Sequence, residues 1–261
     1  MRLTILALVL SGMAVSKAAV IGKTVEYSAD SVTLKGYIAY DDKVTDKRPG
    51  ILVVHEWWGL NDYARKRADM LASLGYVALA VGMYGNGKTV NHPDDAGKFS
   101  SEVMKNMPAM KARFMAALDL LRKNEHVDPS RIGAIGYCFG GGVVLNMARA
   151  GVDLDGVVSF HGNLTTQSPA EKGNVKARLL VCNGAADKFT PAETIKNFKA
   201  EMKGADVNLK FINYPGAMHS FTNPAATELG KKFNLPLAYN EKADKESWAA
   251  MKEFFRKVFK K

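Results

Sequence analysis

The chain has 261 residues, of which 47% are hydrophobic and 24% are charged, a composition typical of a globular protein and unlike that of a disordered or fibrous one. The net charge of +10 raises nucleic acid as a partner, but the lysines and arginines are spread along the chain and often stand near acidic residues, which favours a solvated basic surface. We therefore expect no nucleic-acid partner and one domain, because this length falls within the range of a single α/β domain.

The first 18 residues have the pattern of a signal peptide. Arg2 supplies a short positive start, residues 3–15 are apolar, and Ser16 and Ala18 are small residues at the cleavage positions. A membrane anchor is the alternative, but this stretch is shorter than the roughly 20 residues that span a bilayer. The sequence predicts cleavage after Ala18, a secreted or periplasmic protein, a mature domain of residues 19–261, and no membrane attachment once the signal is removed.

Short apolar runs then alternate with segments of helical spacing. A hairpin is expected at residues 24–27 and 33–39. Runs typical of strands buried on both faces of a parallel sheet are residues 50–55, 76–81, 132–137, 156–160, 177–182 and 207–214. Helical spacing joins Ala64 to Leu74, recurs over residues 110–121, and puts Trp248 and Phe255 on one face of a last helix. This alternation predicts an α/β fold with an open, mostly parallel sheet and helices on both faces.

Ligands of such sheets bind at the carboxyl ends of the strands, so reactive residues were sought there. Residues 136–142 read Gly-Tyr-Cys-Phe-Gly-Gly-Gly between a strand and a helix-like segment, which is the pattern of a nucleophile elbow with Cys138 in place of serine. The glycines are needed because side chains beside the nucleophile would collide with neighbouring backbone. The turn places the thiol at a helix N-terminus and directs the Phe139 N–H toward a developing oxyanion. A packing turn that contains a buried cysteine is the alternative.

Two further candidates follow later strands. Asp187 lies just past the run 177–182, before a predicted helix whose start, Thr190 to Glu193, has the pattern of a capping box. His219 follows the run 207–214 on a turn-rich loop. An ordinary loop aspartate and a structural histidine are the alternatives. Nucleophile, acid and base nevertheless occur in the chain order that α/β-hydrolases use.

A disulfide between Cys138 and Cys182 is the other interpretation of two cysteines in an exported protein. We expect the strand at residues 156–160 to lie between the strands that carry them, which separates the cysteines by two strand spacings, about 9.5 Å. Bridged cysteines need Cα atoms within roughly 7 Å. Cys182 is therefore expected to be a small core residue.

At residues 136–141, 55–59, 184–191 and 219–221 the chain resembles the dienelactone hydrolase family, and the similarity covers most of the mature sequence. The resemblance implies a hydrolase of lactones or activated esters that needs no cofactor or metal, with Cys138 as nucleophile, His219 as base and Asp187 as orienting acid. It further implies that Glu56 contacts the resting thiol and that the Trp57 N–H completes the oxyanion hole. Glu56 ends a buried strand, where a carboxylate needs a partner, and a simple salt bridge is the alternative role.

The sequence departs from the family where substrate-binding arginines are expected. Residues 83–88 and 219–224 contain no arginine, and Lys88 cannot provide the bidentate geometry of a guanidinium. Dienelactone itself is therefore not the expected substrate. Residues near strand ends that could line a substrate pocket are Trp57, Trp58, Tyr84, Lys88, Phe139, His161 and Phe221.

The sequence thus predicts an exported monomeric hydrolase of small esters or lactones. A catalytically silent binding or interaction protein with the same fold is the first alternative. Thiol redox chemistry is the second, although the chain has no C-x-x-C and no resolving cysteine beside Cys138.

Overall fold

The computed structural model describes residues 20–260. The expected signal peptide and its cleavage site after Ala18 lie outside the described residues. Among residues 20–260, no helix has the length and apolar character needed to cross a membrane.

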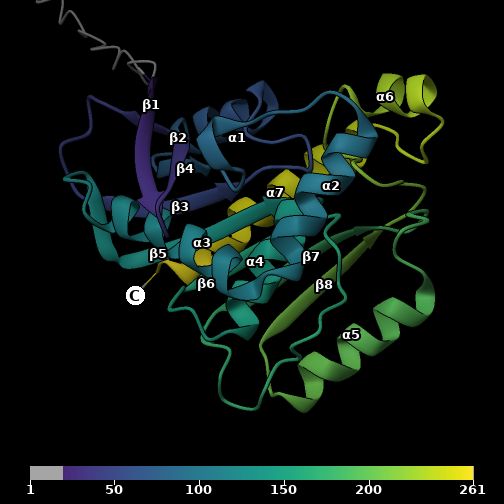
Figure 1. Cartoon of the computed structure of the whole chain (residues 1–261). Coiled ribbons are helices and arrows are strands. Elements are labelled where there is room, and N and C mark those ends of the chain that lie inside the picture. The colour runs from purple at the N-terminus through teal and green to yellow at the C-terminus, as the bar shows by residue number, and fades with distance from the viewer. Residues whose placement is uncertain (1–19, 261) are drawn as a thin grey trace, which may run out of the picture.

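Eight strands form one sheet in the order β1-β2-β4-β3-β5-β6-β7-β8 (Figure 1). β1 pairs antiparallel with β2, and β2 antiparallel with β4, while every later pairing is parallel. The strands are β1 (Val20–Ala29), β2 (Val32–Asp41), β3 (Arg48–Val54), β4 (Val77–Val81), β5 (Val127–Tyr137), β6 (Gly156–Phe160), β7 (Arg178–Gly184) and β8 (Leu209–Tyr214). The predicted hairpin and mostly parallel sheet are confirmed.

Helices cover both faces of the sheet. The helices are α1 (Asp62–Ala72), the short 3₁₀ helix η1 (Gly85–Gly87), α2 (Pro93–Lys105), α3 (Met107–Arg122), α4 (Phe139–Arg149), α5 (Ala192–Gly204), α6 (Ala226–Phe233) and α7 (Glu241–Val258). Buried side chains of α1 and α7 share one hydrophobic cluster with one sheet face, and those of α3, α4 and α5 share a second cluster with the other. The chain therefore has an α/β-hydrolase architecture, as predicted.

The central strands form because their apolar runs are buried on both faces. All five residues of β4 and of β6 are buried, which explains why these runs lack the alternation of a half-exposed strand. β5 begins at Val127, five residues before its apolar run. Its polar start pairs with Arg48 and Pro49, and the register then shifts between Pro49 and Gly50. An irregular, polar start of this kind leaves no hydrophobic period in the sequence.

Three local predictions were wrong. The run 207–214 was expected to be a strand buried on both faces, but β8 is an edge strand in which only Tyr214 is buried. α5 begins at Ala192 with Pro191 as N-cap, and no side chain caps it, so the capping box expected at Thr190 to Glu193 does not form. α1 ends at Ala72, and Leu74 is 42% exposed rather than packed on the apolar face of that helix. The turn that follows, with Gly75 at a φ of +88°, carries Leu74 off the helix.

Candidate active site

Cys138 occupies the turn between β5 and α4. Its backbone has φ 53° and ψ −114°, a region that non-glycine residues rarely adopt, and its side chain is half-buried at the N-terminus of α4. Its N–H is held by the carbonyl of Phe160 at 3.0 Å, from the end of the neighbouring strand β6. The turn therefore lifts the sulfur out of the sheet plane at the carboxyl edge.

The glycines of the turn have the steric role that the sequence predicted. A Cβ added to Gly136 would overlap the backbone of Gly140, and one added to Gly140 would overlap the carbonyls of Val54 and His55. The backbone of α4 thus approaches β3 and β5 more closely than any side chain allows.

His219 and Asp187 converge on the thiol from the loops after β8 and β7. His219 Nε2 lies 3.1 Å from Cys138 Sγ, and its Nδ1 lies 2.8 Å from Asp187 Oδ2. The other oxygen of Asp187 accepts the N–H of Phe189 at 2.8 Å. Since Nδ1 donates to a buried carboxylate, the imidazole is oriented with Nε2 toward the sulfur. The structure brings together the three residues that the sequence singled out.

The surroundings of His219 favour its protonated form. Burial lowers its pKa, but the negative charge on Cys138, the hydrogen bonds to Asp187 and Cys138, and the charge of Asp187 outweigh burial and raise the pKa from 6.5 to about 10. A protonated imidazole 3.1 Å from Sγ is the partner that activates a cysteine nucleophile.

His161 supports the elbow from behind and does not line a substrate pocket, contrary to the prediction. It is fully buried, its Nδ1 shares the Cys138 N–H with the Phe160 carbonyl and lies 3.1 Å from that nitrogen, and its Nε2 lies 2.7 Å from Thr222 Oγ1. Because Nδ1 accepts, Nε2 carries the proton and donates to Thr222. Burial, followed by the charges of His219 and Arg67, holds its pKa well below the usual range, so the ring is neutral.

Glu56 is placed differently from what the resemblance implied. Its buried carboxylate accepts the Ser220 O–H at 2.8 Å and the Asn223 N–H at 2.6 Å, so both oxygens face the loop that carries His219 and not the thiol. Burial raises the pKa of Glu56, and these hydrogen bonds lower it part of the way. Within residues 20–260 Glu56 forms no ion pair, which also argues against the salt-bridge alternative. Asn223 lies in the stretch where the family resemblance led us to expect an arginine, and its side chain donates a hydrogen bond to Glu56.

Two backbone N–H groups are free near the sulfur. Among residues 20–260, the N–H groups of Phe139 and Trp57 donate to no protein group. The Tyr84 O–H, donating to the Trp57 carbonyl at 2.9 Å, fixes the loop that carries Trp57. Tyr84 also packs against the Phe139 ring, with centroids 5.7 Å apart. These two N–H groups are suited to stabilise an oxyanion.

A cavity of about 350 Å³ opens over the thiol. The residues that line it are Trp57, Cys138, Asn163, Phe189, Thr190, His219, Leu235 and Leu237. Phe189 is 54% exposed at this cavity, with its ring edge-on to His219 at 4.9 Å. The lining is largely apolar and contains no lysine or arginine, so it offers no clamp for a carboxylate.

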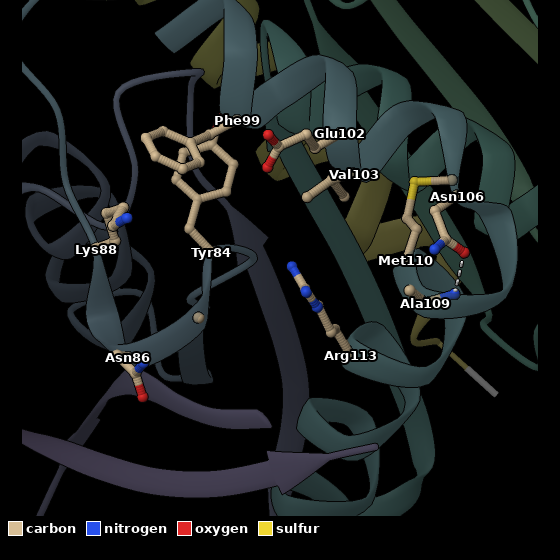
Figure 2. A pocket seen from close by; sticks show the side chains of 11 residues that line it. Tyr84, Asn86, Lys88, Phe99, Glu102, Val103, Asn106, Ala109, Met110 and Arg113 are labelled. Atoms are coloured by element: carbon tan, nitrogen blue, oxygen red, sulfur yellow. Dashed lines mark hydrogen bonds between the residues drawn. The ribbon is translucent and has the colours of Figure 1, made fainter. Parts of the chain in front are cut away.

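Of the seven predicted pocket residues, Trp57 lines this cavity and the other six do not. Trp58 and Phe221 are buried, and Phe221 packs behind the site against His161. Tyr84 and Lys88 border a separate cavity of about 340 Å³, shown in Figure 2. The ammonium of Lys88 lies 4.2 Å from the centre of the Phe99 ring, so it is not directed at Cys138.

The cavity-lining residues that the sequence did not predict lie in loops, where no hydrophobic period marks them. Leu235 and Leu237 follow α6, and an isolated bridge pairs Leu237 with His219. Asn163 stands three residues after β6 and could have been found by the same search of strand ends that found Cys138.

Cys182 is a buried core residue, as predicted. Both cysteines are free. As expected, β6 lies between β5 and β7, so two strand spacings separate β5, which Cys138 follows, from β7, which holds Cys182. Burial raises the pKa of Cys182 to about 12. In the part of the chain that the structure describes, no group of three or more potential metal ligands occurs.

Comparisons with known proteins place the sequence and the fold among relatives. The sequence pattern described as the dienelactone hydrolase family matches residues 34–259. Protein usf of Aquifex pyrophilus is 32% identical over 209 residues, which cover 77% of this chain and 87% of that protein. A dienelactone hydrolase-like promiscuous phosphotriesterase from metagenomic libraries superposes with a TM-score of 0.85 at 33% identity, covering 92% of this chain and 99% of its own. A structure named m3DLH gives 0.86 at 35% identity over the same shares.

Proposed function

Because the chain belongs to the dienelactone hydrolase family, a family of α/β-hydrolases, we propose that it hydrolyses small esters or lactones with Cys138 as nucleophile. The observation that supports this most directly is the continuous line of contacts from Sγ through His219 to Asp187, at 3.1 and 2.8 Å. Each link matches the role that nucleophilic catalysis requires of it.

In the first half of the proposed reaction, the Cys138 thiolate attacks the carbonyl carbon of the ester. The developing oxyanion accepts the N–H groups of Phe139 and Trp57. Collapse of the tetrahedral intermediate breaks the bond to the leaving oxygen, which takes the proton from His219 Nε2, and a thioester remains on Cys138.

In the second half, neutral His219 takes a proton from water, and the resulting hydroxide attacks the thioester carbonyl. The same two N–H groups stabilise the second oxyanion. The carbon–sulfur bond breaks, the acid leaves, and the thiolate–imidazolium pair is restored while Asp187 keeps the ring oriented. No cofactor enters either half.

The lining of the cavity supports a neutral substrate. Leu235, Leu237, Trp57 and Phe189 provide apolar contact, and the cationic side chain nearest in sequence to the family's arginine positions, Lys88, faces a different cavity. An ester or lactone without a carboxylate therefore fits better than dienelactone.

Neutral phosphotriesters are a second substrate class that we propose to test. The metagenomic neighbour at 33% identity is a promiscuous phosphotriesterase, and a phosphotriester, like an ester, places one polar oxygen near the N–H groups and apolar substituents against the walls.

Release of p-nitrophenol from p-nitrophenyl butyrate tests the proposal. The wild-type protein should show a burst and a mass increase of one butyryl group on Cys138, and Cys138→Ala should lose on the order of a thousandfold in kcat or more. Binding of the ester without turnover would instead identify a silent binding protein. Turnover that survives Cys138→Ala would exclude this nucleophile.

A further inference from the structure

The cavity over Cys138 has a neighbouring cavity with which it shares a lining residue. Asn163 lines the 350 Å³ cavity at the thiol and also a neighbouring cavity of about 270 Å³. The second cavity lies between the end of α2, the start of α3 and the loop that follows β6. A substrate at Cys138 that extends past Asn163 would reach this second cavity.

The second cavity differs from the first in its chemistry. Where the first is largely apolar, the second has a mixed lining, in which hydroxyl and amide side chains stand beside Met104, Met107 and Lys105. These polar side chains are Ser101, Asn146, Asn163, Thr165, Thr166, Gln167 and Ser168. A ligand that extends from one cavity to the other would have to be apolar at one end and polar at the other.

The two asparagines present donors to the second cavity. The Oδ1 of Asn163 accepts both the N–H and the O–H of Thr165, at 3.0 and 2.8 Å. The Oδ1 of Asn146, which is 3% exposed, accepts the Thr166 O–H at 2.8 Å. Since both oxygens are occupied, each amide nitrogen is left to donate, and within residues 20–260 neither nitrogen donates to a protein group.

The charges around the second cavity favour an uncharged ligand. No carboxylate lines it, and the one cation, Lys105, is exposed in the last turn of α2, where the partial negative charge of the helix C-terminus already favours a lysine. Hydroxyl groups match this lining, because they accept from amide N–H groups and donate to side-chain oxygens.

We infer that the second cavity binds hydroxyl groups of the substrate, which is an ester with one apolar half and one polyhydroxylated half, such as a glycerol or sugar ester. The apolar half lies among Phe189, Leu235 and Leu237, and Asn163 stands at the junction. This inference rests on the proposed function of Cys138 and narrows its substrate class.

Two matched pairs of esters test the inference and show which half carries the hydroxyls. Glyceryl monobutyrate is compared with propyl butyrate, and ethyl glycerate with ethyl propanoate. In one of the pairs, kcat/KM of the hydroxylated ester should exceed that of its partner at least tenfold.

Loop variants then locate the effect. Asn163→Leu and Thr166→Val should each lower the ratio within the favoured pair at least threefold, because each removes polar groups of the second cavity. Thr24→Val, which makes the same exchange as Thr166→Val on an exposed position of edge strand β1, should leave the ratio unchanged.

The outcomes separate this inference from the proposed function. If the ratio of kcat/KM is near one in both pairs while propyl butyrate is turned over by Cys138, the proposed role of the second cavity is wrong and the proposed ester hydrolysis is unaffected. Absence of turnover and of acylation with every ester would overturn both. Inhibition by millimolar inorganic phosphate that Lys105→Ala abolishes would show that the cavity binds an anion, and would also overturn the inference.

Discussion

Cys138 and Cys182 share a side chain but occupy opposite environments. Cys138 is half-buried beside His219, whereas Cys182 is fully buried in β7, with a pKa that burial raises to about 12. We therefore expect iodoacetamide at neutral pH to modify Cys138 alone and to abolish hydrolysis in proportion, because the thiolate is the reactive form. Peptide mass mapping measures the label. Modification of Cys182 with loss of activity, while Cys138 stays free, would contradict the assignment.

The pH dependence should report the proton on His219. With a pKa raised to about 10, the imidazolium is present below that pH and is lost as the pH rises through it. We expect kcat/KM for an alkyl ester, whose leaving oxygen needs that proton, to fall as the pH rises through about 10. The p-nitrophenyl ester of the same acid is the control, since its leaving group needs no proton and its alkaline loss should be smaller.

Asp187→Asn sharpens this test. Removing the carboxylate removes a charge and a hydrogen bond that raise the pKa of His219, so the alkaline limb should move to lower pH, and kcat should fall at least tenfold because the ring loses its orienting partner. An alkaline limb that stays in place in this variant would show that another group titrates.

The sequence predicted the reactive residues but not most of the residues that line the cavity at Cys138. Cys138 and Asp187 follow buried strands, and His219 follows the partly exposed edge strand β8, so the parallel sheet alone brings the three to one edge. Lys88 and Trp58 also stand near strand ends, but their side chains turn to other neighbours. Side-chain direction in a loop depends on contacts between distant segments, which no local pattern encodes.

Helices α1 and α7 are joined through one buried guanidinium. Arg67 of α1 is 4% exposed, and its Nη2 donates at 2.6 Å both to Asp244 of α7 and to the carbonyl of Thr222. Its guanidinium also lies 5.3 Å from the centre of the Trp248 ring. Because Thr222 also contacts His161, this side chain ties two helices to the loop that carries His219.

We expect Arg67→Ala to lower the free energy of unfolding by about 3 kcal/mol, since it leaves Asp244 and a buried carbonyl without their donor. Urea denaturation measures the change. The matched control is Arg256→Ala, which breaks an exposed pair with Glu253 on the same α7 and should leave the unfolding midpoint unchanged. Equal unfolding midpoints for the two variants would show that the contacts of Arg67 do not stabilise the folded protein.

The elements themselves were predictable where the strands are largely buried. β3, β4, β6 and β7 were found because most of their residues are apolar and buried. α2 was not predicted, and it carries only two buried side chains, Ala96 and Val103, over thirteen residues. This segment was not identified from the sequence, so the second cavity, which α2 helps to form, was not predicted either.

For the whole molecule we propose export, because the first 18 residues have the composition of a signal peptide. The mature protein should begin at Ala19 when the full gene is expressed in its native host. N-terminal sequencing of the periplasmic or secreted fraction decides this. A protein that remains in the cytosol and begins at Met1 would refute the proposal.

The net charge of the whole molecule attracts an anionic substrate, but the cavity at Cys138 offers such a substrate no cationic contact. The net charge of +10 attracts anions over long distances, yet no lysine or arginine lines the cavity at Cys138. Steering acts on encounter and is screened by salt, because the Debye length falls from about 30 Å at 0.01 M to about 8 Å at 0.15 M. A direct contact between a cationic side chain and the substrate carboxylate acts in the bound state and persists at 0.15 M salt.

Ethyl butyrate and monoethyl succinate, a pair of similar length that differs by a carboxylate, separate the two effects. A charged hydrogen bond contributes about 1.5–3 kcal/mol, at least a tenfold preference, so its absence should leave the neutral ester at least as good a substrate at 0.15 M salt. At 0.01 M salt, steering should raise kcat/KM of the succinate alone. A hundredfold preference for the anion at 0.15 M that disappears in Lys88→Ala would mean that this lysine swings from the Phe99 ring to the site and supplies the missing clamp.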